Sequence, residues 1–218
     1  MNYSFLRTLT AIILFTGCQF FGQAKAKYVF YFIGDGMGMG HVNAAQYYNR
    51  MVLGNDDPLL MMQFPVASHI WTYSASSPVT DSAAAGTALA SGSKTRNYMI
   101  GLAPDSVTRY ESVATKLKNE GWGVGVLTSS APDDATPAAF YAHQPNRGML
   151  VEIDNDAIGS GFDFLGGASL RGLTDREGND NGTMDRIKDA GITVVYGADA
   201  AAGATDAKAL WMLSLIHI

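Results

Sequence analysis

Hydrophobic and polar residues follow one another along the chain in blocks that predict strands and helices in turn. The segment KYVFYFIGDG, residues 27–36, is a hydrophobic run that ends in glycines, which is typical of a buried parallel strand followed by a loop. GWGVGVLTSS, residues 121–130, predicts a second buried strand, and GITVVYG, residues 191–197, predicts a further strand.

Helices are predicted between these strands. Residues 112–119 carry apolar side chains at helical spacing, and a second helix is expected around residues 185–189. Thr136 and Pro137 suit the cap and the first turn of another helix. Strands and helices in alternation imply an α/β fold made of layers, with a largely parallel sheet.

The stretch PVTDSAAAGTALASGSKT, residues 78–95, has two interpretations. In the structural one, Thr80, Asp81 and Ser82 are helix N-cap candidates, and the small residues that follow let the helix pack closely. In the functional one, Ser82 lies at a helix N-terminus, where free N–H groups and the helix dipole favour an anion. Caps far outnumber nucleophiles, so this stretch alone favours the structural interpretation.

Two other segments carry candidate chemistry. Asp35 follows the first predicted strand between glycines whose spacing in GDGMGMGH does not match a dinucleotide-binding loop, which leaves a metal ligand as its functional interpretation. Asp134 and Thr136 are two residues apart, which would place both oxygens on one side of an extended segment, as a hard cation requires. Because ligands of parallel sheets bind beyond the carboxyl ends of the strands, Asp35 and residues 129–136 are expected at one edge.

Arg147 follows the predicted helix that begins near Thr136. Its planar guanidinium group offers a bidentate contact to phosphate. A solvated surface charge is the alternative interpretation for Arg147, as a helix cap is for Thr136.

Composition narrows the range of functions. The chain has 218 residues, of which 47% are hydrophobic and 16% charged, as expected for one globular domain. Its net charge of −5 and the lack of a basic run argue against nucleic-acid binding. The single cysteine, Cys18, excludes a disulfide framework and a cysteine-based zinc site.

Residues 1–26 are predicted to be a signal peptide. Arg7 precedes a short apolar core, and AKA at residues 24–26 is a small-x-small cleavage site. The apolar run is too short to span a membrane as a stable helix, so the mature protein is expected to be periplasmic or secreted, without a transmembrane span. A lipoprotein signal ending at Cys18 is the less favoured alternative.

The last six residues, LSLIHI at 213–218, are apolar and differ from the segment before them, which is rich in Ala, Asp and Gly. They are also the translation of a transposon adapter end used in sequencing libraries. We therefore predict that residues 213–218 are not native and that residues 27–212 are the N-terminal portion of a longer catalytic domain. A genuine terminal strand is the alternative.

Taken together, the candidate residues resemble three motifs of the alkaline phosphatase family, between about residues 28 and 147. The matching residues are Asp35 in GDGMG, Asp81 and Ser82 in TDSAAAGTA, and Asp134, Thr136 and Arg147 in DATPAAF and the segment beyond it. The resemblance implies a three-layer α/β sandwich around a largely parallel central sheet, which this chain would leave incomplete at its C-terminus.

The resemblance also implies a role for each residue. Ser82 would be the nucleophile, coordinated and activated by zinc, and Asp35 would bridge a zinc and a magnesium ion. Asp134 and Thr136 would be magnesium ligands. Asp81 would orient Arg147, and Arg147 would bind the substrate phosphate. Two zinc ions and one magnesium ion are the expected cofactors.

The implied activity is the hydrolysis of small phosphate monoesters through a phosphoserine on Ser82, with release of phosphate and an alcohol. Two alternatives remain open. One is a phosphodiesterase or sulfatase of the same superfamily. The other is a catalytically inert fragment that only binds metal or phosphate, because the four histidines of the chain leave the zinc ligands missing. The oligomeric state is open, a homodimer being one alternative.

Overall fold

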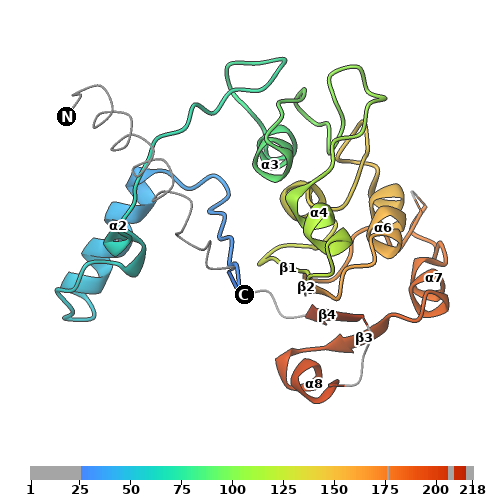
Figure 1. Cartoon of the computed structure of the whole chain (residues 1–218). Coiled ribbons are helices and arrows are strands. Elements are labelled where there is room, and N and C mark those ends of the chain that lie inside the picture. The colour runs from blue at the N-terminus through green and yellow to red at the C-terminus, as the bar shows by residue number, and fades with distance from the viewer. Residues whose placement is uncertain (1–25, 176, 206–208, 215–218) are drawn as a thin grey trace, which may run out of the picture. The chain divides into compact units, whose positions relative to one another are not determined.

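The computed structural model describes residues 26–175, 177–205 and 209–214 (Figure 1). Among these described residues, those up to Gly34 belong to one unit, and those from Asp35 onward belong to another. The predicted signal peptide, except for Ala26, and residues 215–218 of the predicted tail lie outside the described residues. Within the described ranges, no helix has the length and apolar character needed to cross a membrane.

In the part of the chain that the structure describes, four parallel strands form one sheet in the order β1-β2-β4-β3 (Figure 1). In the register of the sheet, Leu165 lies opposite Val126 on one side and Trp211 on the other. The parallel sheet and its connecting helices confirm the predicted α/β class. The strands are β1 Gly125–Leu127, β2 Phe164–Ala168, β3 Thr193–Tyr196 and β4 Leu210–Ser214.

The helices that flank and connect these strands include the helices predicted at residues 112–119 and around residues 185–189. Helix α4 begins after Ser112, whose Oγ accepts a hydrogen bond from the Thr115 N–H at 3.0 Å. Helix α7 leads into β3, as predicted for the last helix–strand pair. The helices are α2 Met39–Met51, the 3-10 helix η1 Leu60–Gln63, α3 Ser82–Ser91, α4 Val113–Asn119, α5 Ala135–Ala138, α6 Leu150–Gly159, α7 Thr183–Asp189 and α8 Ala198–Gly203.

The predicted first strand does not form among the described residues. Residues 27–32 take no strand, and their side chains are exposed, with Phe32 at 87%. An apolar run becomes a strand only where another strand pairs its backbone, and the pattern of side chains alone does not supply that partner. Strand β1 does form but is not buried, because it lies at one end of the described sheet and leaves Leu127 exposed.

Helix α5 begins earlier than predicted. Asp134, rather than Thr136, is its N-cap, and the Asp134 Oδ1 accepts a hydrogen bond from the Ala135 N–H at 2.8 Å. Residues 134–136 are therefore a helix start and not the extended segment that the two-residue spacing indicated. Pro137 lies in the first turn, as expected, because a helix leaves the first N–H groups unpaired.

Strand β4 reaches into the predicted tail. Leu213 and Ser214 lie opposite Gly167 and Ala168 of β2 in the parallel register. The adapter origin of residues 213–218 stays a prediction.

Helix α3 packs closely on α5 through its small residues. Ala83, Ala84 and Ala90 are buried on α3. A Cβ added to Gly86 would lie 3.0 Å from the Ala139 Cβ and 3.4 Å from the Cα of Thr136. The close packing predicted for the small-residue helix is thus confirmed, and it brings α3 against the α5 backbone.

Replacement of Gly86 by alanine tests this packing. We expect G86A to lose about 1–3 kcal/mol in free energy of unfolding, because the added methyl group overpacks the α3–α5 contact. Gly159 of α6 provides a matched control, since an added Cβ there meets nothing within 4 Å. G159A is expected to keep or gain stability, by up to about 1 kcal/mol. Urea unfolding of both variants measures the difference, and equal effects would contradict the packing argument.

Candidate active site

Asp81 organises the N-terminus of α3. Its Oδ1 accepts a hydrogen bond from the Ala84 N–H at 2.9 Å, and its Oδ2 accepts one from the Tyr98 N–H at 3.0 Å. The Arg147 Nη1 lies 3.5 Å from the same Oδ2. Asp81 therefore caps the helix that begins with Ser82 and also contacts Arg147, the residue that the family resemblance implied it would orient.

The Asp35 carboxylate joins two hydroxyl groups that are far apart in the sequence. Ser82 Oγ donates to Asp35 Oδ1 at 3.1 Å, and Thr136 Oγ1 donates to Asp35 Oδ2 at 2.8 Å. The two partners lie 47 and 101 residues from Asp35 along the chain. A carboxylate flanked by two hydroxyl oxygens is a hard donor set, and it fits magnesium in its chemistry.

Asp134 lies in a different environment from Thr136. Its Oδ1 is 2.8 Å from the Arg147 Nη2 and 3.3 Å from the Arg171 Nη2, and its Oδ2 accepts from Ser130 Oγ at 3.2 Å. Burial acts to raise the pKa of Asp134, but the Ala135 N–H and the two guanidinium groups outweigh it and hold this pKa below its ordinary value. The structure thus places Thr136 on Asp35 and Asp134 on the arginines.

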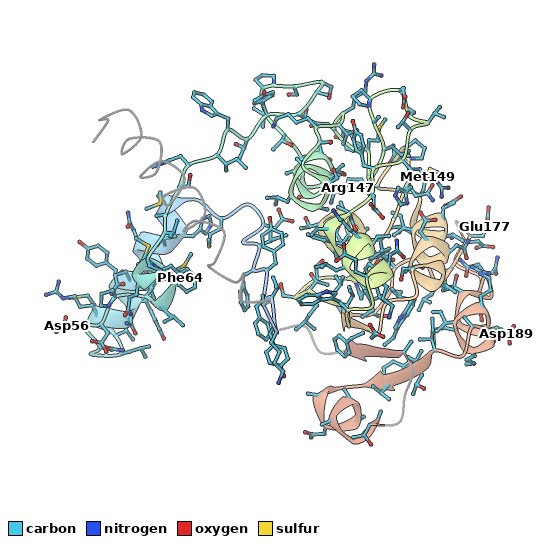
Figure 2. The ribbon with its side chains drawn as sticks, in the orientation of Figure 1. Asp56, Phe64, Arg147, Met149, Glu177 and Asp189 are labelled. Carbon is cyan, nitrogen blue, oxygen red and sulfur yellow. The ribbon has the colours of Figure 1, made fainter. Side chains whose placement is uncertain are left out.

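Arg147, labelled in Figure 2, is linked to the start of α3 through its backbone as well as through its side chain. The Arg147 N–H donates to the Tyr98 carbonyl at 2.7 Å, and the Tyr98 N–H donates to Asp81. Tyr98 adopts a φ of 69°, a left-handed conformation that is unfavourable for a residue with a Cβ. The peptide units on both sides of Tyr98 therefore link the Arg147 segment to the cap of α3.

Two residues at the site were not singled out from the sequence. Asp133 is fully buried, and its Oδ2 accepts hydrogen bonds from the Arg171 N–H at 2.6 Å and the Gly172 N–H at 2.9 Å. Arg171 stands three residues after the end of β2. Its place beyond the carboxyl end of a parallel strand was a usable signal, because ligands bind at that edge.

A second buried carboxyl group lies next to Gly172. Asp154 of α6 is fully buried, and neither of its carboxyl oxygens has a hydrogen-bond partner in the structure. A Cβ added to Gly172 would collide with the Asp154 Oδ2. Burial, and after it the nearby charge of Asp133, raises the pKa of Asp154 to about 8, so this carboxyl group is largely protonated at neutral pH.

The described residues do not fit a pair of zinc ions. They hold no group of three His, Cys, Asp or Glu side chains that could bind a metal ion. The His41 Nδ1 accepts a hydrogen bond from the Gly38 N–H at 3.2 Å, and the His143 Nε2 lies 3.0 Å from the Tyr110 carbonyl oxygen. These two histidines are thus engaged with the backbone.

The chain as a whole is similar to known proteins. Residues 26–171 match the family model described as alkaline phosphatase. The chain belongs to the alkaline phosphatase family. Alkaline phosphatase 4 of Drosophila melanogaster is 35% identical over 150 residues, which cover 64% of this chain and 25% of the relative.

Solved structures of alkaline phosphatases share the fold. The enzyme of the Antarctic bacterium TAB5 is 30% identical and superimposes with a TM-score of 0.72, over 84% of this chain and 52% of that one. A mutant of that enzyme with magnesium bound is 32% identical, with a TM-score of 0.71, and the match covers 84% of this chain and 51% of that one. This chain therefore spans about a quarter of the Drosophila phosphatase and about half of the Antarctic one.

Asp154 gives this alkaline phosphatase chain a testable pH dependence. Its pKa rises from 3.8 to about 8 on folding, so the folded chain holds a proton that the unfolded chain has lost across that window. The free energy of unfolding contributed by this group therefore falls as pH rises through the window and is constant above it. Asp154→Asn removes the titration. Its stability relative to wild type should increase by about 1–3 kcal/mol between pH 5 and pH 8.

Urea unfolding of wild type and D154N at four pH values across that range measures the effect. The titration of groups that do not interact with Asp154 is the same in both proteins and cancels in the difference, and Asp133, whose charge acts on Asp154, is the exception. A difference that stays constant with pH would show that Asp154 is ionised in the folded chain.

Proposed function

We propose that the protein carrying this chain hydrolyses phosphate monoesters through a phosphoserine on Ser82. The proposal rests above all on Ser82 itself, the first residue of α3, whose hydroxyl group is hydrogen-bonded to Asp35 and whose neighbour Asp81 contacts Arg147. A nucleophile, a proton acceptor and a phosphate-binding cation are the parts that this chemistry needs.

The residues divide the reaction between them. Ser82 Oγ attacks phosphorus, the new Oγ–P bond forms as the ester P–O bond breaks, and the departing alcohol takes up a proton. Asp35 Oδ1 accepts the hydrogen bond of the Ser82 hydroxyl and takes up its proton as the Oγ–P bond forms, which balances the proton gained by the departing alcohol. Water then breaks the Oγ–P bond, restores the serine and releases inorganic phosphate.

Charge on the phosphate is stabilised from two directions. The N-terminus of α3 presents backbone N–H groups and the positive end of the helix dipole. Arg147 offers a planar pair of donors to two non-bridging oxygens. A monoester carries two such charged oxygens, which favours it over a diester or a sulfate ester as the substrate.

Asp35 and Thr136 would hold a magnesium ion through their oxygens, and we propose Asp134 as a further ligand. The lowered pKa of Asp134 keeps its carboxylate ionised, as a metal ligand must be. When bound, magnesium supplies positive charge that stabilises the charge of the phosphoryl group. The proposed reaction does not involve zinc, because the described residues do not provide its ligands.

We further propose that the protein acts on small phosphorylated substrates outside the cytoplasm. The support is the signal-like sequence of residues 1–26, with Arg7 before an apolar core and AKA at the cleavage position.

Ser82→Ala tests the nucleophile. In the complete gene product that contains this chain, S82A should form no covalent phosphoenzyme and should lose turnover of a chromogenic phosphate monoester. The same panel includes a phosphate diester and a sulfate ester, on which wild type is expected to be slow. Labelled phosphate trapped on S82A would exclude Ser82 as the nucleophile, and faster turnover of the diester or sulfate would assign another substrate class.

Arg147→Ala and Thr136→Val separate phosphate binding from metal binding. R147A should weaken phosphate binding by about 1.5–3 kcal/mol through the lost charge-assisted contacts and leave magnesium affinity near that of wild type. T136V should do the reverse, with activity partly restored at high magnesium. Calorimetric titration with magnesium and with phosphate distinguishes the two. Loss of magnesium binding in R147A, or unchanged magnesium binding in T136V, would contradict the assigned roles.

A further inference from the structure

Arg171 places a second guanidinium group beside Arg147. The Arg171 Nη2 lies 3.3 Å from Asp134 Oδ1, the same oxygen that the Arg147 Nη2 contacts at 2.8 Å. The two arginine nitrogens therefore lie within two hydrogen-bond lengths of each other. The Arg171 side chain is 47% exposed and that of Arg147 is 28% exposed, so Arg171 is the more accessible of the two.

A buried carboxyl group fixes the position of Arg171. Asp133 is fully buried, and both hydrogen bonds that its Oδ2 accepts come from the Arg171–Gly172 backbone. The Asp133 Oδ1 also lies 3.5 Å from the Arg171 Nε. Burial of a carboxylate is unfavourable, so the fold retains Asp133 at a cost that these hydrogen bonds offset. These hydrogen bonds fix the backbone of Arg171, and the contact with Nε fixes the position of its side chain near the guanidinium group.

Gly172, the residue after Arg171, is also closely surrounded. A Cβ on Gly172 would lie 2.9 Å from the Leu150 backbone and would collide with Asp154, so only glycine fits beside Arg171. Arg171 is thus anchored at its backbone by Asp133 and at its tip by Asp134. A surface arginine that only makes the chain soluble needs neither anchor.

Asp134 contacts both guanidinium groups, and each of them has a further carboxylate oxygen at 3.5 Å, from Asp81 for Arg147 and from Asp133 for Arg171. A guanidinium group has five N–H donors, so an added anion would be bound through the donors that these carboxylates leave free. If Arg147 binds the phosphate of the ester, a second anionic group attached close to that phosphate would lie within reach of Arg171. Guanidinium groups bind phosphate and carboxylate through the same paired donors.

We propose that Arg171, anchored by buried Asp133 and sharing Asp134 with Arg147, is a second anion-binding residue. It would select phosphate monoesters that carry another phosphate or a carboxylate close to the ester phosphate. The inference rests on the proposed function, because it takes Arg147 as the partner of the ester phosphate.

The experiment measures binding of two probes to the 218-residue chain in magnesium-containing buffer. Inorganic phosphate occupies one anion site, and methylenediphosphonate, which is not hydrolysed, spans two. We expect wild type to prefer methylenediphosphonate by about 10-fold or more, the usual range for a hydrogen bond to a charged group. Arg171→Met should remove most of this preference and leave phosphate affinity unchanged, whereas Arg171→Lys should keep part of it. Arg109→Met, a change at an exposed arginine outside the cluster, should behave as wild type.

The contrary results are distinct. Equal affinity of wild type for the two probes would overturn the inference. So would an R171M variant that weakens both probes equally or weakens magnesium binding, because Arg171 would then be a positioning residue for Asp134. If wild type binds neither probe, the phosphate site of the proposed function is itself contradicted, and the inference falls with it.

Discussion

Close packing between α3 and α5 determines where the chemistry of this chain can occur. Gly86 brings α3 against Ala139 and the backbone of Thr136, and Asp35 accepts a hydrogen bond from the start of each helix, at Ser82 and at Thr136. Their caps, Asp81 and Asp134, are therefore near enough for one arginine, Arg147, to contact both. A larger residue on this face would separate the helix starts before it disturbed any functional side chain.

The carboxyl groups of the site fall into two environments with different chemistry. Asp35 is bonded to hydroxyl groups, which suits it to a cation. Asp134 forms ion pairs with two guanidinium groups, and the N–H donors that these groups have left can bind an anion. A phosphate ester with a bound magnesium ion presents both charges at once. The arrangement places the oxygen-rich part of the site at Ser82 and the cationic part at the carboxyl ends of the strands.

Local features of the structure could be predicted well from the sequence, and features that depend on distant partners could not. Asp81, one of the three N-cap candidates, caps α3, because a cap is made within four residues. The run at residues 27–32 did not form a strand, since strand formation needs a partner that no local pattern supplies. The three motifs identified Ser82, Asp35 and Arg147, but Asp133 and Arg171 acquire their meaning from burial and from contacts between separate segments.

The left-handed conformation of Tyr98 has a mechanical consequence. Its N–H group binds Asp81 and its carbonyl group binds the backbone of Arg147, so one residue links the start of α3 to the arginine segment. Thermal motion of either segment is then transmitted to the other through a short and conformationally restricted connection. Ser82 and Arg147 should consequently fluctuate together, and the distance between them should vary less than the displacement of either one.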